Sequence, residues 1–94
     1  MKISIEFIGF PEVVSTIGQK KLEMHAEGTV SDLINALVRQ YGKGVRSSFY
    51  GADGTFDMNI QVILNGKEFL SVDKHDSQLK EGDEVIFMLA MAGG

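Results

Sequence analysis

The sequence predicts an α+β domain in which one main helix packs on one face of a mixed sheet of four or five strands. Three observations support this prediction. Segments near both ends of the chain alternate apolar and polar residues, with the period of a strand that has one buried face. The segment 30–41 instead carries apolar residues at helical spacing. At 94 residues the chain is too short for two independent cores, so these elements belong to one domain.

Two strands are expected near the N-terminus, over 2–10 and 20–26. Their apolar residues recur at every second position: Ile3, Ile5, Phe7, Leu22 and Met24. The second strand is expected to pair with the first as a hairpin. Pro11 and Gly18 lie between the two strands and predict a loop or turn there.

A helix is expected over 30–41. Thr29 precedes it where an N-cap belongs, and Asp32 follows three residues later, as in a capping box. Gly42 ends the pattern. The helical stripe consists of Val30, Leu33, Ile34, Leu37, Val38 and Tyr41.

The next stretch, 43–57, is expected to be a turn-rich connection. It is rich in glycine and includes the pair Asp53-Gly54. Its apolar residues are expected to anchor it to the core; they are Val45, Phe49 and Phe56.

A hairpin is expected over 59–70. Asn65-Gly66 is the strongest short signal for its turn, and Phe69-Leu70 begins the return strand. The residues of the first strand that face one way are Ile60, Val62 and Leu64.

The last strand follows Leu79 and a turn at 81–83, and it is apolar on both faces. One face carries Val85, Phe87 and Leu89, and the other carries Ile86 and Met88. Strands of this kind usually lie in the centre of a sheet. The order strand, strand, helix, strand, short strand, strand then describes a β-grasp, with the helix covering one face of the sheet.

Composition excludes several classes of function. The chain has no cysteine, and therefore no disulfide, thiolate metal site or thiol nucleophile. Its net charge of −4 argues against a nucleic-acid partner, because such binding depends on clustered Lys and Arg. No apolar run approaches the ~20 residues of a membrane span. The first residues do not resemble a signal peptide, so a cytoplasmic location without membrane contact is expected.

The titratable residues form no recognisable catalytic or metal-binding motif. His25 and His75 have no companions at ligand spacing and are expected to face solvent singly. A group of acidic residues is expected to form a solvated face, because its spacing does not match a calcium loop. The group consists of Asp73, Asp76, Glu81, Asp83 and Glu84. No metal site is expected.

The sequence closes with Ala92-Gly93-Gly94, beyond the last expected strand. Residues 1–89 are expected to form the folded domain, and 90–94 a flexible tail. A pair of glycines has no architectural use there. A chain end without side chains would, however, pass through a narrow channel in a partner.

Four segments together resemble the small ubiquitin-like sulfur carriers of the MoaD and ThiS families. They are "GTVSDLINAL" at 28–37, "VILNGKEF" at 62–69, "LKEGDEVIF" at 79–87 and the final Ala-Gly-Gly. These segments run across most of the chain in family order. The extended connection at 43–58 is most similar to the small subunit of molybdopterin synthase, the MoaD type.

The resemblance implies a carrier and not an independent enzyme. Gly94, with Gly93 beside it, would be adenylated and converted to a thiocarboxylate that donates sulfur in molybdopterin or tungstopterin synthesis. The implied partners are an ATP-dependent adenylyltransferase of the ubiquitin-activating type and the large subunit of molybdopterin synthase, or an analogous sulfur acceptor enzyme. The activating partner would consume ATP, and this chain would bind no cofactor.

Residues near the tail are expected to contact these partners: Met91, Ala92, Phe87 and Met88. For Phe87 and Met88, core positions on the two faces of the sheet are the alternative. Three other functions stay open. The chain could be a modifier joined through Gly94 to lysines, a sulfur carrier of the thiamine pathway, or an interaction domain whose Gly-Gly end is incidental.

Overall fold

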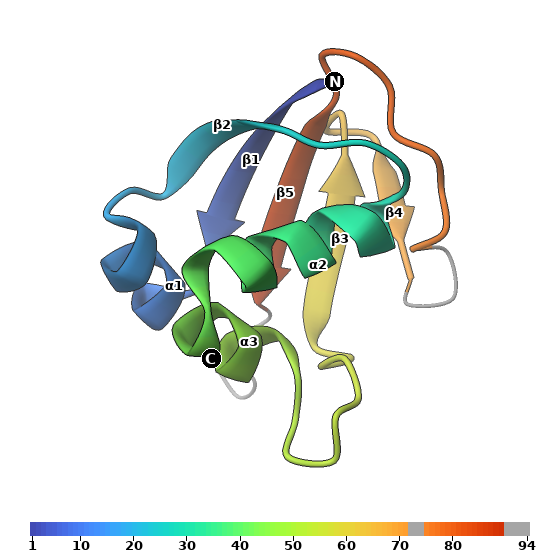
Figure 1. The fold of residues 1–94 in the computed structure, drawn as a ribbon. Coiled ribbons are helices and arrows are strands. Elements are labelled where there is room, and N and C mark those ends of the chain that lie inside the picture. Colours follow the sequence, from blue (N-terminus) through green and yellow to red (C-terminus); the bar gives the residue numbers. More distant parts are fainter. Residues whose placement is uncertain (72–74, 90–94) are drawn as a thin grey trace.

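The computed structural model describes residues 1–71 and 75–89, and its centre is a mixed five-stranded sheet (Figure 1). The strands are β1 (Lys2–Ile8), β2 (Lys21–His25), β3 (Ile60–Leu64), β4 (Glu68–Leu70) and β5 (Glu84–Leu89). Their order is β2-β1-β5-β3-β4, in which β1 and β5 are parallel and the other neighbours are antiparallel. The β-grasp prediction and the central position of the last strand are both confirmed.

The main helix, α2 (Val30–Tyr41), has the predicted bounds and the predicted capping box. The N–H of Asp32 donates to the hydroxyl oxygen of Thr29 at 3.2 Å, and the N–H of Thr29 donates to the Asp32 carboxylate at 2.9 Å. These bonds satisfy donors that a helix start leaves unpaired. The backbone hydrogen bond from Thr29, followed by the one from its hydroxyl, lowers the pKa of Asp32 below its ordinary value of 3.8.

The segment between β1 and β2 is a helix, α1 (Pro11–Ile17), so the loop prediction there was wrong. Pro11 occupies the start of the helix, and Gly18 ends it with a φ of 90° and an N–H that donates to the carbonyl of Val14 at 2.7 Å. Proline at the start and glycine after the end are favourable helix limits. The fully buried Val13 supplies packing that offsets the low helix propensity of a β-branched segment.

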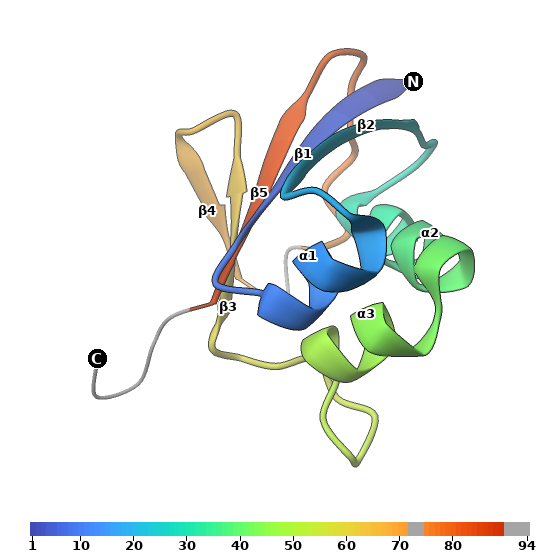
Figure 2. The same ribbon diagram turned by 90° about the vertical axis from the view of Figure 1, so that its left-hand side faces the viewer.

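The connection after α2 also begins with a helix that was not predicted, α3 (Lys43–Phe49). Val45 and Phe49 lie one turn apart and are both fully buried, which confirms them as anchors. Phe56 packs against this core, with its ring centroid 6.0 Å from that of Phe49. Among the described residues, three helices instead of one therefore lie on one side of the sheet (Figure 2).

Two residues that were predicted to face solvent are buried. The ring of His75 makes an edge contact with Phe56 at a centroid distance of 4.8 Å. Asp83 accepts hydrogen bonds from the side-chain amide of Asn65 at 3.0 Å and from the N–H of Lys80 at 2.8 Å, and these bonds offset the desolvation of its carboxylate. The predicted exposure is confirmed for His25, Asp76, Glu81 and Glu84, whereas Asp73 lies outside the described residues.

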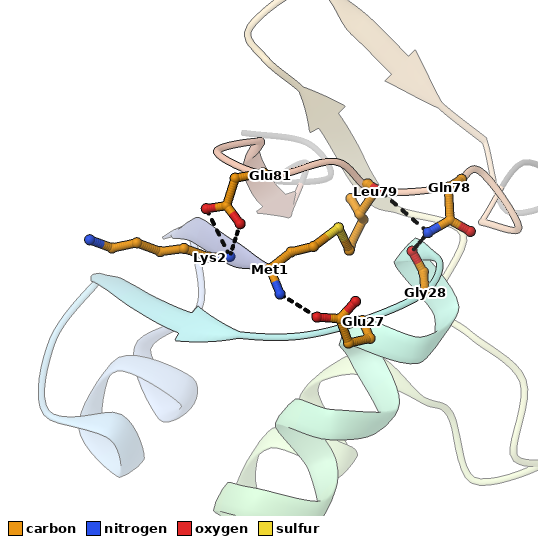
Figure 3. Close-up of polar contacts among 7 residues, drawn as sticks. All are labelled: Met1, Lys2, Glu27, Gly28, Gln78, Leu79 and Glu81. Carbon is orange, nitrogen blue, oxygen red and sulfur yellow. Dashed lines mark hydrogen bonds and ion pairs between the residues drawn. The ribbon is translucent and has the colours of Figure 1, made fainter.

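Contacts between distant segments close the end of the sheet at which β1 and β5 begin (Figure 3). The N-terminal ammonium group pairs with Glu27. The N–H of Lys2 lies 3.2 Å from each carboxylate oxygen of Glu81, and the side-chain amide of Gln78 donates to the carbonyl of Gly28 at 2.7 Å. These contacts tie β1, the connection before α2 and the turn before β5 together. Leu89, the last described residue, lies at the opposite end of the sheet.

Candidate functional site

The two neighbours of the central strand β5 pair with it almost to its last residue. On one side, its parallel pairing with β1 runs to Ile8 opposite Met88. On the other side, its antiparallel pairing with β3 places Leu89 opposite Ile60. Neighbouring strands on both sides therefore hold the backbone almost to the last residue of β5 (Figure 2).

The predicted reactive end lies outside the described residues. This applies to Gly93 and Gly94, to the partner-binding residues Met91 and Ala92, and to the predicted tail 90–94 as a whole. The part of the site that the structure describes is the end of β5 and the strand residues beside it.

Phe87 is a core residue. Its ring stacks on Phe7 at a centroid distance of 5.7 Å and lies 5.1 Å from the ring of Phe49. Phe87 is 0% exposed and has no surface with which to touch a partner, so its predicted partner contact was wrong and the core alternative holds. Its burial anchors β5 two residues before the strand ends.

Met88 lies on the other face of the sheet, which no helix of the described residues covers (Figure 2). It is partly exposed and lies opposite Ile8 and Gln61 in the two strand registers. Apolar side chains continue across this face, and we call them the outer stripe: Ile8, Ile63, Phe69, Ile86 and Met88. Ile8 is 40% exposed and Phe69 is 68% exposed, Ile86 and Met88 are partly exposed, and Ile63 is buried. Exposed apolar surface of this kind is typical of protein interfaces.

Ile8 and Phe69 were not predicted to be surface residues, although the sequence of β1 carries a signal for Ile8. Ile8 is apolar on the face where β1 otherwise presents Ser4 and Glu6. Phe69 lies opposite Ile63 in the register of β3 and β4, and this pairing puts it on the same face. The break in alternation could therefore have identified Ile8 from the sequence, whereas the place of Phe69 required the strand register.

Charged residues of both signs border the outer stripe on the side of β2. Glu6 lies opposite Lys21, and the Lys2 ammonium is 3.4 Å from the Glu23 carboxylate. An exposed ion pair like that of Lys2 and Glu23 adds little to stability. Charges at the rim of an interface can nevertheless guide the approach and orientation of a partner.

Within residues 1–71 and 75–89, no group of three or more His, Asp or Glu side chains is placed to hold a metal ion. In the same part of the chain, no helix combines the length and the apolar character needed to cross a membrane. What the described residues offer is an exposed apolar surface beside a strand that leads towards the Gly-Gly end.

Comparisons with known proteins identify relatives with the same fold. The sequence model of the ThiS family matches residues 8–94. Ubiquitin-related modifier 1 of Schizosaccharomyces pombe is 26% identical over 98 aligned positions that cover both chains completely. The crystal structure of SAMP1 from Haloferax volcanii matches the whole of both chains with a TM-score of 0.76 and 23% identity.

Another solved structure with this fold comes from a complex of subunits 1 and 2 of the molybdopterin-converting factor from Helicobacter pylori 26695. It matches the whole of both chains with a TM-score of 0.61 and 20% identity. The family match covers nearly all of the chain and includes β5 and the residues after it. The chain therefore belongs to the ThiS family, whose members are small ubiquitin-like carrier and modifier proteins.

Proposed function

We propose that this chain is a sulfur carrier whose Gly94 carboxylate is adenylated and then converted to a thiocarboxylate. The match to the ThiS family carries the proposal, because it extends over residues 8–94 and so includes the Gly-Gly end of the sequence. The fold supports it, since β5 leads from the centre of the sheet into residue 90. Residues 1–89 then serve as the docking body and 90–94 as the reactive tail.

Two bond changes load the sulfur. A carboxylate is a poor electrophile, so a Gly94 carboxylate oxygen first attacks the α-phosphorus of ATP, pyrophosphate leaves and an acyl-adenylate forms. A sulfur nucleophile at the oxidation level of hydrosulfide then attacks the acyl carbon, AMP leaves and the thiocarboxylate remains. The activating partner supplies the catalytic groups and consumes the ATP. This chain supplies the acyl group.

The tail is suited to reach a buried active site. Five extended residues span about 17 Å, and Gly93 and Gly94 keep the end of the chain narrow. Met91 and Ala92 then contact the walls of the entry, while the outer stripe docks the body. Burial of apolar surface in the outer stripe offsets the entropy lost when the tail is ordered in the partner.

Two partners follow from this chemistry. One is an adenylyltransferase of the ubiquitin-activating type, and the other is an enzyme that accepts the sulfur. The large subunit of molybdopterin synthase is our first candidate for the acceptor, and the likeness to the complex from Helicobacter pylori supports it. The sulfur would then enter molybdopterin or tungstopterin synthesis in the cytoplasm.

Attachment of Gly94 to proteins is a second candidate function, favoured by the full-length similarity to ubiquitin-related modifier 1. In this case a lysine amine attacks the same acyl-adenylate, AMP leaves and an isopeptide bond forms. Gly-Gly remnants on cellular lysines, lost when Gly94 is deleted, would support this function. Thiocarboxylate without any conjugates would count against it.

The carrier function is tested by incubating the chain with the adenylyltransferase of its own organism, ATP and sulfide. We expect one oxygen to be replaced by sulfur in the intact mass, and fragmentation to locate the change at Gly94. A variant that lacks only Gly94 is the matched control, because its folded body is unchanged. It should not be loaded, because its terminal carboxylate lies one residue short of the reacting position. If neither pyrophosphate nor sulfur-bearing protein appears with a partner that loads another carrier, the proposal is wrong.

A further inference from the structure

The chain after β1 passes directly against the end of β5 at Gly9. The φ of Gly9 is 84°, in the left-handed region that disfavours side chains. A Cβ added to Gly9 would lie 3.1 Å from the carbonyl oxygen of Leu89 and 3.4 Å from its Cβ. The first distance is shorter than ordinary van der Waals contact. A side chain at position 9 therefore requires Leu89 to move.

Leu89 is less firmly held than the residues before it. Ile60 pairs with it on the side of β3, but the pairing with β1 ends one residue earlier, at Ile8 and Met88. Gly9 occupies the place beside Leu89 on the side of β1. The carbonyl of Leu89 belongs to the peptide bond with Ala90, so the contact with Gly9 bears on the first peptide group beyond the strand.

We infer that Gly9 is a positioning residue that sets the direction in which the chain leaves β5, an inference that rests on the proposed carrier function. A side chain at Gly9 would displace the Leu89 carbonyl and tilt the peptide plane that follows. The partner holds the body through the outer stripe, so the position of the Leu89 carbonyl sets where the tail starts relative to the partner's active site. Because a misplacement of about 1 Å at a reacting group can lower a rate about 100-fold, adenylation of Gly94 should be sensitive to it.

The chain contains a matched control for this contact. Gly82 has a φ of 81°, and no described atom lies within 4 Å of a Cβ added there. Gly82 precedes β5, at the end of the sheet opposite Leu89. A side chain at Gly82 therefore meets the same backbone preference as one at Gly9 but leaves the end of β5 untouched. Asparagine tolerates left-handed φ better than most residues, which makes it a suitable replacement at both positions.

The test compares Gly9→Asn with Gly82→Asn in the ATP-dependent loading reaction. For Gly9→Asn we expect kcat to fall about tenfold or more, with little change in KM, because the docking surface is retained while the tail is misdirected. For Gly82→Asn we expect a rate within about twofold of the natural chain, as for a surface substitution. Amide NMR resonances of Leu89 and Ala90 should shift in Gly9→Asn only.

Equal loading rates for the two variants, or unchanged Leu89 and Ala90 resonances in Gly9→Asn, would overturn the positioning role of Gly9. Either result would leave the carrier function intact as long as the natural chain is loaded. Failure of the natural chain to load would overturn both proposals together. Gly9→Ala is a milder variant for the case in which Gly9→Asn does not fold, and the same two readouts apply to it.

Discussion

Phe7 and Phe87 lie opposite each other in the parallel pair of β1 and β5, and their rings stack with a centroid distance of 5.7 Å and an interplanar angle of 15°. Both side chains are buried. Cross-strand aromatic pairs stabilise a sheet beyond the apolar area that they bury. This pair therefore holds the central strand close to the point at which the predicted tail begins.

Replacement of Phe87 should show how much of the fold depends on this pair. Phe87→Ala is expected to lower the free energy of unfolding by about 3–5 kcal/mol, because a buried ring is lost and a cavity remains. Phe87→Leu should lose less, because leucine refills part of the volume. Urea denaturation followed by circular dichroism measures both variants. Equal stabilities of the two variants would contradict the described packing.

The exposed part of the outer stripe should contribute to docking and not to folding. Ile8→Ser is expected to raise KM for the activating enzyme about fivefold or more. This corresponds to a loss of about 1 kcal/mol or more of binding free energy, as is found when an important interface residue is truncated. Lys21→Ser, on the same face but in the edge strand, should change KM by less. Loading kinetics and urea denaturation of both variants separate docking from stability. An unchanged KM for Ile8→Ser would exclude Ile8 from the docking surface.

The capping carboxylate of Asp32 should make the stability of the chain depend on pH. Its pKa is lower in the folded chain than the ordinary value of 3.8, so its contribution to stability is present above that value and is lost as the pH falls through the folded-state pKa. The stability advantage of the natural chain over Asp32→Asn should therefore shrink below pH 3.8. Urea denaturation of both chains over a pH series measures this difference in the free energy of unfolding. A difference that grows on acidification would contradict the capping geometry.

Asn65 links the turn between β3 and β4 to the turn before β5. Its amide donates to Asp83 at 3.0 Å, and its side-chain oxygen accepts from the N–H of Glu84 at 2.8 Å. Asn65→Asp replaces the donor with a second carboxylate oxygen beside a buried carboxylate, and we expect a loss of about 1–3 kcal/mol at neutral pH.

The loss in Asn65→Asp should shrink on acidification, because protonation of the introduced carboxylate removes the repulsion. Asn65→Gly is the matched control: it tolerates the φ of 55° and removes the hydrogen bonds without adding charge. Thermal unfolding at several pH values compares the two variants. A loss in Asn65→Asp that does not depend on pH would mean that charge repulsion is not the cause.

The longest elements were predictable from sequence because their signals are local. The capping box of Thr29 and Asp32, followed by a regular apolar stripe, marks the start of α2 without any knowledge of the rest of the chain. The two apolar faces of β5 similarly indicate a central strand. In both cases local propensity and tertiary packing favour the same structure.

The two short helices could not be predicted in the same way, because they depend on contacts between distant segments. α1 and α3 have seven residues each, fewer than an isolated helix needs to be stable. They pack against each other closely enough that a Cβ on Gly44 would lie 2.6 Å from the hydroxyl oxygen of Thr16. Pro11 and Gly18 did mark the limits of α1, but the same residues also suit a loop.

The candidate site was only partly readable from the sequence. The Gly93-Gly94 end is recognisable by residue type, because its proposed chemistry needs a backbone carboxylate and no side chain. The exposed positions of Ile8 and Phe69 depend on strand register, and the contact between Gly9 and Leu89 depends on where the chain turns after β1. Apart from the break in polar alternation at Ile8, these three-dimensional relationships have no short sequence signature.

Whether Gly94 carries sulfur in the cell is tested most directly by the mass of the C-terminal peptide isolated from the source organism. We predict a peptide that ends at Gly94 and has sulfur in place of one carboxylate oxygen, and we predict that this form disappears when the activating enzyme is deleted. A peptide that continues beyond Gly94, or one that is always the plain carboxylate in cells that contain the activating enzyme, would contradict the carrier function.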